Sequence, residues 1–156
     1  MKLASTLILV STVLATSVLN AAESTPSKEL AARGRRVWAI FECCALASVA
    51  EEKDLRERLF QYGYSEGRAF LKAIEDGKVS RADLSREVPV GLLLLLQGPS
   101  VDFILGRIYA GAEENALDKI YRGDVAGNSD LAKALAKEEL HKRNCELLTP
   151  TSQEKH

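Results

Sequence analysis

Apolar residues recur at spacings of three and four along most of the chain, and no segment alternates apolar and polar residues. The first pattern is typical of helices with one buried side, whereas alternation would indicate strands. We therefore predict an all-α fold, a compact bundle of five to six helices. The predicted helices cover 28–50, 54–76, 80–88, 89–97, 101–121 and 129–148.

The segment 88–121 holds the densest apolar run after the N-terminus, with five consecutive leucines at 92–96. Leucine favours helices, and five residues fall far short of the roughly 20 that cross a bilayer. Gly98 and Pro99 end this run, because glycine suits the position after a helix and proline cannot continue one. We expect 88–121 to form a helical hairpin at the buried centre of the domain.

Residues 1–21 resemble a secretory signal peptide. Lys2 supplies a positive charge, 3–19 is apolar and uncharged, and Ala21 and Ala22 are small residues suited to cleavage. The pattern predicts a periplasmic protein that is cleaved near one of these alanines. An uncleaved membrane anchor is the alternative.

The rest of the chain has the length of one domain, so we predict a single helical domain at 22–150 and a polar tail at 151–156. After cleavage we expect no stable membrane insertion. The sequence has 21 Lys and Arg against 22 Asp and Glu, a net charge of −1, with the two signs mixed along the helices. Because no basic block with aromatic residues is present, we expect no nucleic acid among the partners.

The chain contains three cysteines, which in an exported protein favour a disulfide. Cys43 and Cys44 are adjacent in a predicted helix, where their side chains diverge by about 100° and cannot easily bond each other. Either could bond Cys145 and so join the first and last helices of the exported chain, and we favour Cys43 because it lies at the edge of the apolar side. The leftover cysteine would be a buried thiol, with a catalytic thiol or an intermolecular disulfide as alternatives.

Neither a metal nor a cofactor is expected. Cys43, Cys44, His141 and Cys145 lack the paired spacing of zinc ligands. The chain also carries neither a phosphate-binding loop nor a dinucleotide-binding glycine motif.

Gly63-Tyr64-Ser65-Glu66-Gly67 matches the G-x-S-x-G pattern of a hydrolase nucleophile. That pattern needs a sharp turn between a strand and a helix, with a histidine base in reach. Here it lies inside a predicted helix, in a chain with only two histidines. We therefore interpret Gly63 and Gly67 as the place where another helix crosses closely, and we predict that the protein is not an enzyme.

Two short motifs carry a family resemblance. Trp38 precedes Cys43 in W-A-I-F-E-C, and the segment 144–147 reads Asn-Cys-Glu-Leu. This arrangement resembles the small periplasmic all-helical immunity proteins that neutralise type VI secretion cell-wall amidases. The resemblance implies binding to a toxic hydrolase through an exposed loop or helix face, for which 123–128 and 75–85 are the first candidates.

The combined expectation is an exported, non-catalytic helical binding protein, such as an inhibitor or immunity protein that covers a cell-wall-degrading enzyme. Its partner would then be a protein, with a cell-wall hydrolase as the leading class. One alternative is an envelope structural or stress protein that acts by self-association, for example as a homodimer. The other is a small serine hydrolase that uses Ser65.

Overall fold

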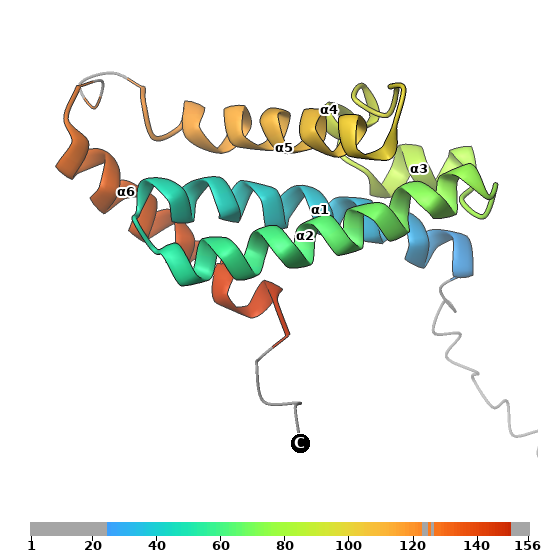
Figure 1. Cartoon of the computed structure of the whole chain (residues 1–156), viewed down its shortest axis with the longest axis horizontal. Helices are drawn as coiled ribbons and strands as arrows, with labels where there is room; N and C mark the ends of the chain where they lie inside the picture. Colours follow the sequence, from blue (N-terminus) through green and yellow to red (C-terminus); the bar gives the residue numbers. More distant parts are fainter. Residues whose placement is uncertain (1–24, 123–124, 126, 151–156) are drawn as a thin grey trace, which may run out of the picture.

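The computed structural model describes residues 25–122, 125 and 127–150, and its regular elements are all helical. The predicted all-α fold with six helices is confirmed, and Figure 1 shows α1 running between α2 and α5. The predicted signal peptide and polar tail lie outside the described residues. The elements in order are α1 (Pro26–Val49), α2 (Lys53–Glu75), α3 (Arg81–Glu87), α4 (Val90–Leu93), α5 (Val101–Asp118), α6 (Ser129–Lys142) and the 3₁₀ turn η2 (Cys145–Leu148).

The centre of the domain is α1. Every residue from Phe41 to Ala47 is buried, because this stretch is apolar on nearly every side and α2, α5, α6 and η2 all pack against it. The expectation that 88–121 forms the buried centre is therefore wrong. Within that segment α5 buries one side, but Val90 and Leu94 are 70% and 74% exposed.

The predicted helix at 89–97 is also wrong, since α4 has only four residues. After it the backbone N–H groups of Leu95 and Leu96 bond carbonyls three residues back instead of four. These are the hydrogen bonds of a 3₁₀ turn, which ends the helix before Pro99, a residue without a backbone N–H group. Among the five leucines Leu92 is fully buried and Leu94 points to solvent, so the run is not a continuous core segment.

Side chains cap the starts of α3, α5 and α6. Ser80 and Ser100 accept hydrogen bonds from backbone N–H groups three residues later, at 3.1 and 3.2 Å. At α6 the cap is Asn128, whose side-chain oxygen accepts from the N–H of Leu131 at 3.0 Å.

Two other predicted boundaries are shifted. The helix predicted at 54–76 begins at Lys53, with Glu52 at the cap position, and ends at Glu75. The last helix ends at Lys142, not at 148, because Asn144 adopts a left-handed backbone with φ of 51°. Asparagine tolerates this conformation better than most residues do, and it redirects the chain into η2.

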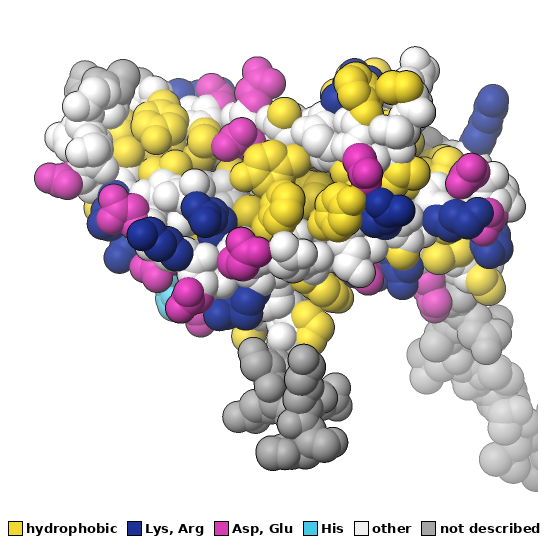
Figure 2. Space-filling model, in the orientation of Figure 1, with side chains coloured by type: hydrophobic (Ala, Val, Ile, Leu, Met, Phe, Trp, Pro, Cys, Tyr) yellow, Lys and Arg dark blue, Asp and Glu magenta, His cyan; other side chains and the backbone are white. Residues whose placement is uncertain are grey.

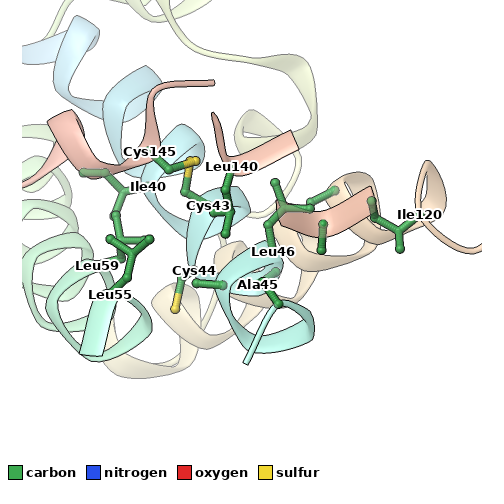
Figure 3. Close-up of a cluster of buried hydrophobic side chains, with 14 of the residues drawn as sticks. Ile40, Cys43, Cys44, Ala45, Leu46, Leu55, Leu59, Ile120, Leu140 and Cys145 are labelled. Carbon is green, nitrogen blue, oxygen red and sulfur yellow. A yellow bond between two sulfur atoms is a disulfide. The ribbon is translucent and has the colours of Figure 1, made fainter. Parts of the chain in front are cut away.

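The disulfide Cys43–Cys145 joins α1 to η2, with 5.7 Å between the Cα atoms. The predicted pairing is confirmed. Cys44, the third cysteine of the chain, is a buried free thiol. Figure 3 shows the two sulfur atoms bonded beside Ile40 and Leu140, while the Cys44 side chain points in another direction. The bond lies in a cluster of buried apolar side chains from α1, α2, α5 and α6.

A buried ionic contact lies next to the disulfide. Glu42 is only 8% exposed, and its carboxylate accepts hydrogen bonds from Asn115 and, at 2.8 Å, from the Arg143 guanidinium. Arg143 also donates to Glu139, four residues earlier in the chain, at 3.4 Å. A buried carboxylate is tolerated only when it is paired, so this contact sets how the end of α6 meets α1.

We predict that opening the disulfide destabilises the fold by about 4–5 kcal/mol, less any strain, since the bond closes a loop across 102 positions. The variant carrying Cys43→Ala and Cys145→Ala should unfold at lower denaturant than the oxidised wild type and should not respond to reductant. Cys44→Ala is the control and should lose stability on reduction as the wild type does. Three free thiols in non-reducing peptide maps would contradict the bond.

Candidate protein-binding surface

The two glycines of the G-x-S-x-G pattern lie where α2 packs against its neighbours. A Cβ atom on Gly63 would lie 2.7 Å from Phe41 Cε1 in α1, and one on Gly67 would lie 2.5 Å from Leu105 Cδ2 in α5. A real Cβ atom could not lie this close to a neighbouring side chain unless the neighbour moved. The glycines therefore allow α2 to approach two different helices closely.

Ser65 lies between these glycines in the middle of α2 and is exposed. Its backbone is regular helix, without the strand-to-helix turn that presents a nucleophile in this motif. His141 lies on α6 and borders a groove of about 550 Å³ between the start of α2 and η2, whose lining does not include Ser65.

A partly exposed group of aromatic rings follows the boundary between α2 and α5. We call it the aromatic strip and define it as Phe60, Tyr64 and Tyr109. The rings of Phe60 and Tyr64 stack with centroids 6.3 Å apart, and Tyr109 meets Phe60 edge-on at 5.9 Å. Figure 2 shows hydrophobic side chains gathered on this part of the molecule.

The strip is fixed from below. Tyr109 meets the buried ring of Phe41 edge-on at 5.4 Å, so the outer rings rest on the core of α1. Phe60 remains 39% exposed above it. Because each ring contacts another ring, the strip presents its apolar area in a single arrangement.

Polar groups border the strip at its Tyr64 end. The Tyr64 hydroxyl donates to Asp102 at 2.7 Å, and Arg68 donates to the same carboxylate at 2.9 Å. The Arg68 guanidinium also lies over the Tyr64 ring, 5.7 Å from its centroid. Asp102 thus ties the start of α5 to α2 and neutralises Arg68 at the edge of the aromatic surface.

At the inner edge of the strip, Tyr109 is partly buried beside Cys44, and both groups are held in their neutral forms. Burial raises the pKa of the Cys44 thiol, against a smaller opposite effect of the nearby Tyr109 hydroxyl. Burial likewise raises the pKa of Tyr109 to about 12, and Cys44 and Glu113 add to it. Since the thiolate is the reactive form of cysteine, this environment disfavours nucleophilic chemistry at Cys44.

Sequence reasoning missed the aromatic strip. Its only sequence signal is the spacing of Phe60 and Tyr64, four apart and so on one side of α2. Of the loops that the resemblance suggests for binding, 123–128 is described only in part. The other, at 75–85, is tied to α1 through the Ser27 hydroxyl, which bonds Asp83 and the N–H of Ser80.

We predict opposite effects for the same substitution at two helical glycines. Gly63→Ala should lower the free energy of unfolding by about 1–3 kcal/mol, because the buried Phe41 and Ile40 side chains have to move. Gly106→Ala is the matched control, since a Cβ atom there meets nothing within 4 Å. It should stabilise the fold by up to about 1 kcal/mol through helix propensity alone. Equal effects in urea unfolding would contradict the close helix crossing.

We also predict that stability falls as the pH rises from about 10 to about 12. The folded pKa of Tyr109 lies above its ordinary value of 10.0, so the neutral phenol favours the folded state below pH 10. That contribution is lost as the pH passes through the folded pKa. Tyr109→Phe should flatten this part of the stability curve, and absorbance should show one tyrosine titrating late. Simultaneous titration of all tyrosines near pH 10 would contradict the buried hydroxyl.

Within 25–122, 125 and 127–150, no group of three His, Cys, Asp or Glu side chains is arranged to hold a metal ion. None of the helices in these ranges is both long and apolar enough to cross a membrane.

Comparison with protein families, curated proteins and solved structures finds no match. The chain matches no protein-family model, and neither a curated protein nor a solved structure is significantly similar to it.

Proposed function

We propose that the protein is an exported, non-catalytic helical binding protein that inhibits a cell-wall-degrading enzyme by covering its active site. The observation that carries this proposal is the aromatic strip. An exposed Phe and two half-buried Tyr side chains, backed by a rigid core and bordered by an arginine, have the composition of the central residues of protein interfaces.

The choice of a cell-wall hydrolase as partner rests on the sequence resemblance and on the predicted signal peptide. The two motifs of that resemblance, which lie more than 100 residues apart, are joined by the bond from Cys43 to Cys145. A fold closed in this way suits an oxidising compartment outside the cytosol. Covering an active site requires no catalytic group on the inhibitor, which is consistent with the neutral, buried Cys44 and the helical setting of Ser65.

The test begins with the exported protein as bait in envelope extracts of its own species. We expect one cell-wall hydrolase at a fixed ratio, and the purified hydrolase should lose peptidoglycan-cleaving activity when the protein is added. The variant carrying Phe60→Ala and Tyr64→Ala should bind this enzyme about 100-fold more weakly, as expected when two interface anchors are removed.

Leu131→Ala is the matched control, because Leu131 is 40% exposed, close to the 39% of Phe60, and lies on α6 outside the strip. It should leave both affinity and inhibition unchanged. Unchanged binding of the double variant would exclude the strip as the interface. Recovery of the bait alone, as a defined oligomer, would favour the self-associating envelope protein.

A further inference from the structure

The segment 88–101 is the longest part of the described chain without a charged residue. It contains α4 and the turn before α5. Two of its aliphatic side chains, Val90 and Leu94, are 70% and 74% exposed, whereas Leu92 between them is fully buried. Figure 2 shows a hydrophobic group over α4 with the side chain of a Lys or Arg beside it. We call Val90 and Leu94 the aliphatic tip.

The aliphatic tip is held firmly from below. Leu92 belongs to the buried cluster that includes Phe41 and Phe70, and the half-buried Trp38 packs against this cluster. Gly91, between Val90 and Leu92, packs against the Trp38 ring. A Cβ atom at this position would lie only 3.1 Å from Trp38 Cη2. The two exposed side chains therefore project from a fixed base.

The charges near the tip favour an anionic partner. Glu87 is paired with Arg35 at 2.9 Å, and Asp102 is paired with Arg68 at 2.9 Å. Arg107, by contrast, donates to the uncharged carbonyl oxygen of Gln97 at 2.6 Å and keeps its charge. The acidic groups on either side of the tip are thus neutralised, while a cation at its base is not.

Exposed cations also precede the tip in the chain. Arg81 and Arg86 lie on α3 and are exposed, and α3 packs against α4. Asp83 of the same helix, whose pKa is lowered by hydrogen bonds from Ser27 and Ser80 and by the charge of Arg86, offsets one of these two positive charges. Two projecting aliphatic side chains beside a set of basic side chains match the chemistry of a membrane interface, where acyl chains lie beneath anionic phosphates.

We propose that the aliphatic tip docks the protein on the surface of a membrane that carries anionic phospholipids. Val90 and Leu94 enter the boundary between headgroups and acyl chains, and the arginines of α3 and Arg107 contact lipid phosphates. A lipid surface fits this tip better than a protein partner does, because the tip projects outward instead of forming a groove, and the half-exposed Phe103 ring beside Arg107 is also typical of a membrane-facing side. This inference is independent of the aromatic strip and of the identity of any partner.

The test uses the exported full protein with vesicles of phosphatidylcholine alone or mixed with phosphatidylglycerol. Trp38 is the one tryptophan of the chain, and it lies under the tip, so its fluorescence reports the environment at the base of the tip. We expect a blue shift and co-sedimentation with the anionic vesicles that weaken as salt is added. Val90→Ser combined with Leu94→Ser should reduce binding about ten-fold.

Leu147→Ser is the matched control, because Leu147 is 79% exposed but lies on η2. It should bind anionic vesicles as the wild type does. The proposal is overturned if the wild type ignores anionic vesicles, if the double variant still binds them, or if Leu147→Ser loses as much binding. A double variant that keeps vesicle binding but loses a protein partner would assign the tip to protein recognition instead.

Discussion

The burial of residues 41–47 of α1 on every side is the constraint on which the rest of the structure depends. A helix that is apolar around its circumference has to be enclosed, and no single neighbour can cover it. Here α2, α5 and α6 each cover a different part of it, with η2 closing the end that carries Cys43. The close approach of α2 at Gly63 is one consequence, because the α1 side chains occupy the space that a larger residue would need.

Two consecutive residues of α1 secure the C-terminal part of the chain by different means. Cys43 forms the disulfide with Cys145, and Glu42 forms an ion pair with Arg143, which lies two residues before Cys145. The disulfide acts mainly by restricting the unfolded chain, whereas the buried ion pair penalises any arrangement that leaves Glu42 alone. Together they fix where α6 and η2 meet α1, although α6 is joined to α5 by a connecting segment of ten residues (119–128).

A rigid core also explains why the exposed apolar side chains are informative. The aromatic strip rests on Phe41 and the aliphatic tip rests on Leu92 and Trp38, so neither can fold inward. Surfaces that are ordered before binding lose little conformational entropy when a partner arrives. The two surfaces differ in chemistry, with aromatic rings and a paired arginine in one and aliphatic groups near an excess of arginines in the other.

The sequence by itself determined the helical class, most helix positions and the favoured disulfide, because helical periodicity and the angle between adjacent side chains are local properties. It could not show which apolar segment is buried most deeply, and the run of five leucines therefore led us to place 88–121, and not α1, at the centre of the domain. Only the tertiary structure decided that Leu94 faces solvent while Leu92 is buried, and that Glu42 meets Arg143 across 101 positions. The contact between Tyr109 and Phe60 is likewise a product of the tertiary structure, because the aromatic strip forms only where α2 and α5 pack together.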